Sequence, residues 1–240
     1  MSQVSRIVGV LGGMGPDATV DFMSKVIALT DADCDQDHVR MLVDHNPQIP
    51  NRQAAILHGG ADPGPVLAAM AAGLEAAGAE FLVIPCNTAY VFEAAIREAT
   101  TIPLVSIINE SVEAVRRAAP HALRVGVLAT DGCLRSGVYQ AGLDAQGLTP
   151  VLPGRAEIDE FMVLTNAIKA RTHDARTGLD MAALAAALVT RGAEAIIAGC
   201  TEIPLVLRAG DVAVPLVAST DALAAKTVML ATGIEPLPDR

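Results

Sequence analysis

The chain has 240 residues, a formal net charge of −10, and only 2% aromatic residues, with no Trp. An acidic chain without a basic stripe repels phosphate backbones and has few rings to stack on bases, so we expect no nucleic-acid partner. The start, MSQVSRIVGVLGG, lacks the pattern of a signal peptide, and no run of 18 or more apolar residues follows. We therefore expect no membrane partner and predict a cytoplasmic location.

Short apolar runs alternate with alanine-rich stretches along the whole chain. The pattern predicts strands at 6–11, 38–44, 81–85, 104–108, 124–129 and 193–198, and helices at 16–29, at 64–77 and from Ser136. Strand–helix alternation with continuous apolar strands is typical of α/β proteins, in which a parallel sheet is covered by helices. We therefore predict an α/β fold with parallel sheets.

The two halves of the chain resemble each other in detail. The sequence VGVL at 8–11 recurs at 125–128, and the Gly-Ala-Glu segment at 78–80 recurs at 192–194. Such a repeat indicates two similar α/β domains. In sheets of this kind, ligands bind beyond the carboxyl ends of the strands.

The four cysteines of the chain fall into two groups. Cys86 and Cys200 each follow the glycine of the repeated Gly-Ala-Glu segment by eight residues, end an apolar run and precede polar residues. Their matching positions make them candidate site residues, although a free cysteine is most often a buried apolar residue. Cys34 and Cys133 lack this context, so we expect them to pack in the core. No CxxC pair is present, and we predict neither a disulfide framework nor a zinc site.

Several segments resemble the aspartate racemase family of the Asp/Glu racemase superfamily. GVLGGMGP at 9–16, PCNTA at 85–89 and GCTEIP at 199–204 are similar to its motifs, and 46–52 is similar to its substrate-recognition segment. The resemblance extends over nearly the whole chain, and the segments at 129–130 and 136–140 resemble the start of the family's second domain.

The resemblance implies two similar flavodoxin-like domains related by a pseudo-twofold axis, with the active site in the cleft between them. It implies domain boundaries at 1–103 plus 215–240 for the first domain and 104–214 for the second. It also implies catalysis without a cofactor or metal, and a homodimer.

The resemblance further implies an amino-acid racemase in which Cys86 and Cys200 are an acid–base pair. Racemisation removes the α-proton from one face and returns a proton to the other, so two opposed groups can exchange roles. Thiol pKa values near neutrality, lowered by helix N-termini and amide donors, would suit this chemistry. Substrate-binding roles are expected for Met14, Gln48, Arg52, Asn87, Thr88, Thr130, Lys169, Thr201 and Glu202.

Two cations indicate the substrate. Arg52 lies in the recognition segment and Lys169 falls where the family carries a substrate-facing lysine, so we predict that they bind the two carboxylates of aspartate or glutamate. Glu202 either orients a neighbour or the substrate ammonium, or is a helix-start carboxylate favoured by the dipole. The family commonly has His at Tyr90 and in the strand around Ser106, and these departures concern substrate preference.

Other functions remain open from the sequence. Within the same fold, the chain could be a maleate isomerase, a hydantoin racemase or an arylmalonate decarboxylase, although the last needs only one cysteine. A non-catalytic amino-acid-binding protein would use the same fold for a different function. The glycine-rich turn at 9–16 would suit a nicotinamide-dependent oxidoreductase only weakly, because its glycine spacing is not GxGxxG.

Overall fold

The computed structural model describes residues 5–239. Residues 1–4, which belong to the segment read for a signal peptide, and residue 240 lie outside this range. The chain divides into two compact units, Met1–Ile107 with Thr220–Arg240, and Ile108–Ser219. Within 5–239, no helix is both long and apolar enough to cross a membrane.

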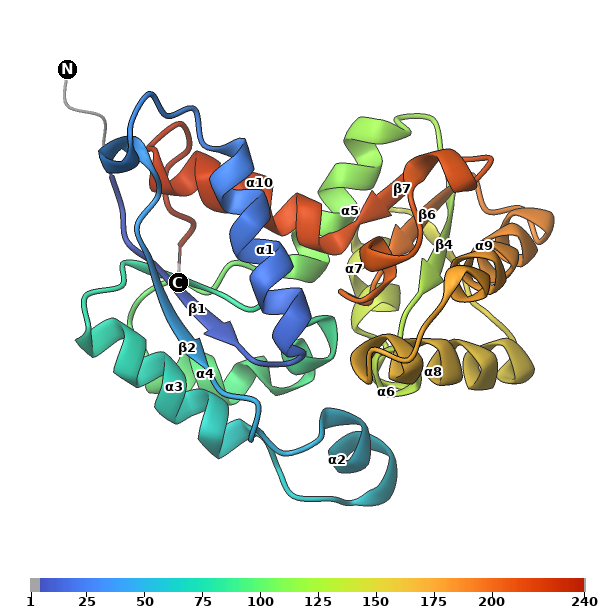
Figure 1. The fold of residues 1–240 in the computed structure, drawn as a ribbon, viewed down its shortest axis with the longest axis horizontal. Coiled ribbons are helices and arrows are strands. Elements are labelled where there is room, and N and C mark those ends of the chain that lie inside the picture. Colours follow the sequence, from blue (N-terminus) through green and yellow to red (C-terminus); the bar gives the residue numbers. More distant parts are fainter. Residues whose placement is uncertain (1–4, 240) are drawn as a thin grey trace. The chain divides into compact units, whose positions relative to one another are not determined.

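The first unit is built on a three-stranded parallel sheet in the order β2-β1-β3. Its strands are β1 (Val8–Gly12), β2 (Met41–His45) and β3 (Phe81–Val83). Its helices are α1 (Pro16–Leu29), α2 (Arg52–His58), α3 (Gly64–Ala76), α4 (Glu93–Ala99) and nearly all of α10 (Ser219–Ala231), with 3₁₀ helices η1 (Asp35–Asp37) and η2 (Asn87–Phe92). Within this unit, α3 and α4 lie on one side of the strands, and α1 and α10 on the other (Figure 1).

The second unit contains a four-stranded parallel sheet in the order β5-β4-β6-β7. Its strands are β4 (Arg124–Leu128), β5 (Thr149–Val151), β6 (Ala195–Ala198) and β7 (Leu216–Ala218). Its helices are α5 (Ile107–Ala118), α6 (Asp131–Ser136), α7 (Val138–Ala145), α8 (Arg155–Lys169) and α9 (Ala175–Thr190), with 3₁₀ helices η3 (Ile203–Leu205) and η4 (Ala209–Asp211). The predicted α/β class with parallel sheets is confirmed.

The sequence repeat corresponds to a repeat in packing. Gly9 of β1 and Gly126 of β4 occupy matching strand positions, and each is closely covered by side chains of the helix and strand that follow in its own unit. A Cβ atom on Gly9 would lie 2.7 Å from Leu82 Cδ2, and one on Gly126 would lie 3.1 Å from Ile196 Cγ1. Glycine therefore lets this later helix and the adjacent strand approach the central strand closely in both sheets.

The Gly-Ala-Glu repeat also has the same role in both units. Gly78 and Gly192 have φ angles of +99° and +92°, which reverse the chain between a helix and the next strand. The glutamates then bind the start of the central strand: Glu80 Oε2 accepts from the Ile7 amide at 2.7 Å, and Glu194 Oε2 accepts from the Leu123 amide at 2.6 Å. The repeat thus fixes the register of the strand that leads to each cysteine.

Three predicted elements differ from the structure. The strand predicted at 104–108 is wrong, because only Leu104 forms a bridge, with Leu82, and α5 begins at Ile107. The strand predicted from 38 begins at Met41, after η1. A helix was predicted to begin at Ser136, but Ser136 ends α6, and Gly137, with φ +76°, separates it from α7.

The chain returns from the second unit to the first after Ser219, whereas the expected boundary lies after residue 214. The expected boundary after 214 would separate β7 from the second unit, whereas β7 pairs with β6 there and the division falls after Ser219. The complete pair of domain boundaries stays a prediction.

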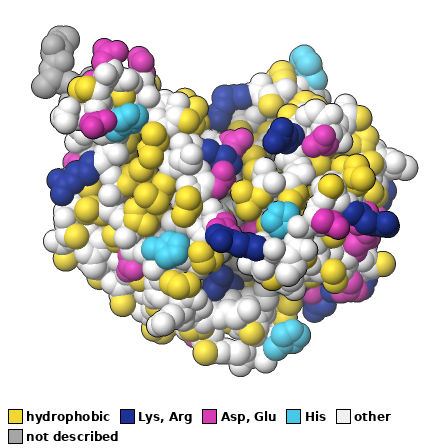
Figure 2. Space-filling view, in the orientation of Figure 1, with side chains coloured by type: hydrophobic (Ala, Val, Ile, Leu, Met, Phe, Trp, Pro, Cys, Tyr) yellow, Lys and Arg dark blue, Asp and Glu magenta, His cyan; other side chains and the backbone are white. Residues whose placement is uncertain are grey.

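On the first unit, apolar side chains gather over α1, where Val20, Ile27 and Leu29 are exposed (Figure 2).

Candidate active site

Cys86 lies at the carboxyl edge of the first sheet, three residues after the end of β3. It is in an extended conformation directly before η2 and is 7% exposed. Asn87 and Thr88, the first residues of η2, are buried as well. Buried polar side chains next to a buried thiol can hydrogen-bond a ligand group that displaces water.

The segment after β2 contributes two further side chains to this edge. Asn51 caps α2 by accepting hydrogen bonds from the amides of Gln53 and Ala54 at 2.9 and 3.1 Å, so the helix begins at Arg52. Gln53 Nε2 lies 3.5 Å from Thr88 Oγ1 and donates to it, which connects α2 to η2. Gln53 was not predicted from the sequence, and only its place beside Arg52 could have indicated it.

Arg52 is held by its own loop. Its Nη1 donates to the carbonyls of Ile49 at 3.3 Å and Pro50 at 3.1 Å, and the side chain is half-buried. These contacts fix the guanidinium plane without neutralising its charge. Gln48, predicted to bind substrate, is exposed on the same loop.

The glycine-rich loop after β1 is folded tightly onto the segment after β2. Gly13 has a φ of +94°, and a Cβ there would lie 2.4 Å from the carbonyl carbon of Asn46, so only glycine fits. The Gly13 amide donates to Thr19 Oγ1 at 2.9 Å. Met14 is buried in this loop, so Met14, Arg52 and Cys86 all lie on segments that follow strands of the first sheet.

Cys200 lies in the matching position of the second unit, two residues after the end of β6. It is 5% exposed, and its Sγ donates a hydrogen bond to Glu202 Oε2 at 3.0 Å. Thr201 Oγ1 donates to the same oxygen at 3.4 Å. Glu202 is buried and its side chain makes no capping hydrogen bond to η3. Its contacts with Cys200 and Thr201 fit the predicted role of orienting a neighbour better than that of a helix-start carboxylate.

Lys169, the last residue of α8, reaches the same carboxylate. Its Nζ lies 3.7 Å from Glu202 Oε1, and its side chain is 41% exposed. Lys169 is thus paired with a protein carboxylate, whereas the sequence predicted that it faces a carboxylate of the substrate.

The environment of Cys200 differs from the expected one. Burial, and then the negative charge of Glu202, raise the pKa of the Cys200 thiol well above its ordinary value, and Lys169 opposes this. A pKa near neutrality was expected, with help from helix N-termini. However, the elements that follow Cys86 and Cys200 are short 3₁₀ helices, which offer a small dipole.

Tyr139 packs behind the Cys200 loop. It is fully buried, and a Cβ on Gly199 would lie 2.7 Å from its Cε2 atom. Its hydroxyl donates to Ser111 Oγ at 3.4 Å, and burial raises its pKa above the ordinary value for a tyrosine. The sequence placed Tyr139 in a segment that resembles the start of the family's second domain but indicated no site role for it, because its contact with Gly199 joins distant segments and leaves no local pattern.

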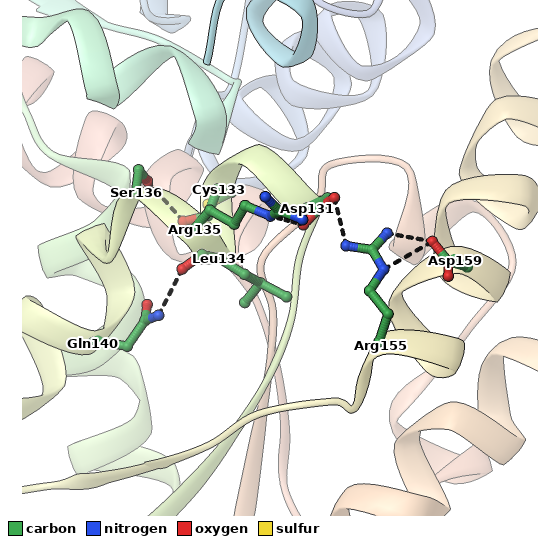
Figure 3. Close-up of polar contacts among 8 residues, drawn as sticks. All are labelled: Asp131, Cys133, Leu134, Arg135, Ser136, Gln140, Arg155 and Asp159. Carbon is green, nitrogen blue, oxygen red and sulfur yellow. Dashed lines mark hydrogen bonds and ion pairs between the residues drawn. The ribbon is translucent and has the colours of Figure 1, made fainter. Parts of the chain in front are cut away.

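Thr130 precedes a network that fixes the loop after β4 (Figure 3). Asp131 is buried, and its carboxylate accepts from Arg135 Nε at 3.0 Å and from Arg155 Nη1 at 2.8 Å. Arg155 also binds Asp159 on α8. Because this network ties α6 to α8, it holds the buried Thr130 at the carboxyl edge of the second sheet.

The same figure shows how α6 ends. Ser136 Oγ donates to the Cys133 carbonyl at 2.7 Å, and Gln140 Nε2 donates to the Leu134 carbonyl at 2.7 Å (Figure 3). Cys133 is buried, as predicted. The same prediction for Cys34 is wrong: Cys34 is exposed, and its Sγ donates to Asp37 Oδ2 at 3.2 Å.

The two departures from the family pattern lie together. Tyr90 is buried, and its hydroxyl donates to the carbonyl of Val105, next to Ser106. Burial raises the pKa of Tyr90 above its ordinary value, so it stays neutral. The hydrogen bond from Tyr90 to Val105 therefore holds η2 in place without adding a charge.

The described residues offer no arrangement of three or more His, Cys, Asp or Glu side chains that could hold a metal ion. In each unit, a buried thiol and buried polar side chains gather at the carboxyl edge of a parallel sheet. The first unit adds the guanidinium of Arg52, which its own loop holds in place. The second unit adds the carboxylate of Glu202, which accepts a hydrogen bond from the Cys200 thiol.

Comparison with known proteins assigns the chain to a family. Residues 11–227 match the family model Asp/Glu/Hydantoin racemase. The broad-specificity amino-acid racemase RacX of Bacillus subtilis is 29% identical over 92% of this chain and 96% of its own.

Solved structures agree with the fold. The aspartate racemase of Picrophilus torridus has a TM-score of 0.81 at 26% identity, covering 97% of this chain and 96% of that one. A glutamate racemase from Bacillus anthracis has a TM-score of 0.66 at 17% identity, covering 99% and 85%. The chain belongs to the Asp/Glu/hydantoin racemase family, a family of isomerases.

Proposed function

We propose that this protein is a cofactor-independent amino-acid racemase that uses Cys86 and Cys200 as its two acid–base groups. The observation that carries the proposal is the matching place of the two thiols. Each is buried at the carboxyl edge of one of two repeated sheets, and each is followed by buried polar residues. The family and its racemase relatives support the reaction type.

The reaction needs one thiolate and one thiol. The thiolate removes the α-proton as the C–H bond breaks, and the electron pair passes into the α-carboxylate. The thiol then gives its proton to the opposite face of the carbon, and becomes the thiolate. No electrons enter or leave the protein. Because the two cysteines belong to different units, the proposal requires that both thiols reach one α-carbon.

The carbanion requires stabilisation at the α-carboxylate. We assign this role to the side chains of Asn87, Thr88 and Thr201, which are buried beside the cysteines. Hydrogen-bond donors that are already fixed in a site of low dielectric stabilise developing negative charge more than water does. Asn87 and Thr88 have protein contacts of their own, which orient them.

The proposed substrate is an acidic amino acid, aspartate or glutamate. Arg52 supports this proposal, because its guanidinium is held by two carbonyls and retains donors for a carboxylate. Met14, Gln48 and Thr130 are proposed to complete the substrate contacts.

A second candidate is racemisation of a wider range of amino acids. Lys169 favours it, because pairing with Glu202 offsets the positive charge that would have bound a second carboxylate. The broad-specificity relative points the same way. Rates on acidic, neutral and basic amino acids separate the two candidates: Arg52→Ala should impair only acidic substrates if the first is right, and all substrates alike if the second is right.

The test of the two-thiol proposal is replacement of each cysteine. Cys86→Ala and Cys200→Ala should each lower kcat by about 100- to 10,000-fold, because a positioned general acid or base typically contributes that much. Cys34→Ala and Cys133→Ala are the controls and should retain activity. Near-normal turnover by either of the first two variants would contradict the proposal.

Three further properties are part of the proposal. We expect activity to survive treatment with EDTA and hydroxylamine, which would remove a metal or pyridoxal phosphate. A cytoplasmic location and a homodimer are likewise proposed. The exposed apolar residues of α1 are of the kind found at protein interfaces, and sedimentation would test whether the protein is a dimer.

A further inference from the structure

The two cysteines have different neighbours two residues further along the chain. Thr88 stands at this position after Cys86, and Glu202 stands there after Cys200. Glu202 is 4% exposed, and its carboxylate is in direct contact with the Cys200 thiol. The repeat thus contains one carboxylate that acts on only one of two otherwise matching thiols.

We propose that Glu202 is a positioning residue that keeps Cys200 protonated in the resting enzyme, so that Cys86 is the thiolate that begins catalysis. This inference rests on the proposed two-thiol racemase, because that mechanism needs one thiol and one thiolate. Beyond that mechanism, the inference states that Cys200 holds the proton and that Glu202 keeps it there.

The contacts of Glu202 support this assignment. Three polar groups converge on its two oxygens: Cys200 Sγ at 3.0 Å and Thr201 Oγ1 at 3.4 Å donate hydrogen bonds to Oε2, and Lys169 Nζ forms an ion pair with Oε1 at 3.7 Å. An ionised carboxylate accepts hydrogen bonds and donates none, so the proton of the Cys200–Glu202 contact belongs to the sulfur.

Loss of that proton would be unfavourable. It would leave a thiolate and a carboxylate about one hydrogen-bond length apart in a buried site, and like charges at that distance strongly disfavour double ionisation. Lys169 from α8 opposes this, but it lies on the far oxygen and is partly exposed to solvent. Tyr139 from α7 is neutral, with Cys133 of α6 beyond it, so neither supplies a compensating positive charge.

The two directions of the reaction therefore differ. When Cys86 removes the α-proton and Cys200 delivers its own, the enzyme is left with a thiolate beside Glu202. Before the next turnover in the same direction, Cys86 must release the proton that it took to solvent, and Cys200 must regain one. Because the two enantiomers have equal free energies, kcat/KM must be the same in both directions. The asymmetry will appear as different kcat values, matched by different KM values.

The experiment is site-resolved alkylation of the full-length protein by iodoacetamide between pH 6 and 11, read by peptide mass spectrometry without substrate. Cys86 and Cys200 are similarly buried, so a difference in their pH midpoints reports protonation more than access. Cys34, which is exposed, serves as an internal control for the reagent. Circular dichroism checks that each variant is folded.

In the wild type, Cys86 should label at a lower pH than Cys200. Glu202→Gln, which removes charge but not size, should lower the Cys200 midpoint by at least about one pH unit, or roughly tenfold in labelling rate below the midpoint. Lys169→Gln, at a partly exposed position, should move the midpoint the opposite way, and it keeps the test decisive if the first variant fails to fold. The Cys86 midpoint should stay in place in both.

Equal midpoints for the two cysteines in the wild type would overturn the inference, as would a Cys200 midpoint that neither variant moves. Because labelling needs no turnover, its outcome is independent of the proposed function. Expected midpoints in a protein that racemises no amino acid would overturn the racemase proposal but leave the protonation of Cys200 in place.

Discussion

The two halves of this protein share their framework and differ in their reactive groups. In both sheets a glycine of the central strand allows close packing, a glycine with positive φ turns the chain, and a glutamate binds the start of that strand. After the cysteines the halves diverge: Cys86 is followed by Asn87 and Thr88, and Cys200 by Thr201 and Glu202. The shared glycines and glutamates thus place the two thiols at matching positions in their sheets. The different side chains beside the thiols make them chemically unequal.

The largest structural effect should come from Gly199, which has no glycine counterpart before Cys86. In Gly199→Ala the new Cβ would lie 2.7 Å from the ring of the fully buried Tyr139, so the Cys200 loop must move. We expect a loss of about 2–3 kcal/mol in the free energy of unfolding, as in overpacked cores, and a lower kcat.

The matched control for this change is the double variant with Tyr139→Leu. If the ring is the obstacle, Gly199→Ala should cost less in that background than in the wild type, as measured by urea denaturation. Equal costs in both backgrounds would show that the clash is elsewhere, since the two changes would then be independent.

An intermediate effect should separate the two central strands. Gly9→Ala brings a Cβ within 2.9 Å of the Ala79 Cβ, a rigid neighbour, whereas the nearest contact in Gly126→Ala is 3.1 Å. We expect Gly9→Ala to destabilise the protein by about 2 kcal/mol and Gly126→Ala by about 1 kcal/mol or less. Thermal or urea unfolding of the two variants would measure this, and the reverse order would contradict the packing described for β1 and β4.

The smallest difference between the two halves is expected at their turn glycines. Gly78 and Gly192 have nearly equal positive φ angles, and no backbone atom crowds either position. Replacement by Ala should therefore cost about 1–2 kcal/mol in each case, from backbone conformation alone. Costs that differ by more than about 0.5 kcal/mol, the usual limit of independent effects, would show that the two turns are not equivalent.

Much of the fold could be predicted from the sequence, because it depends on local patterns. The apolar runs and the VGVL and Gly-Ala-Glu repeats predicted two parallel α/β sheets and the places of Cys86 and Cys200. Two strands of three residues each, β5 and β7, escaped prediction. β5 has three residues and includes Pro150, and its pairing with β4 depends on contacts far apart in the chain.

The candidate site was less predictable, because its contacts join distant segments. The contact of Lys169 with Glu202 joins the end of α8 to the loop after β6, and no spacing in the sequence indicates it. The same holds for Tyr139 behind Gly199 and for Gln53 on Thr88. The exposure of Cys34 depends on how η1 lies on the unit, which a short polar segment does not reveal.

The most direct test of the central claim is racemisation of a single enantiomer in heavy water, followed at early times by NMR and chiral separation. If Cys86 and Cys200 act on opposite faces of the α-carbon, the inverted product should carry deuterium while the remaining substrate keeps its proton. Neither Cys86→Ala nor Cys200→Ala should form the inverted product. Deuterium appearing equally in both enantiomers from the start, or inversion by either variant, would contradict a two-thiol mechanism.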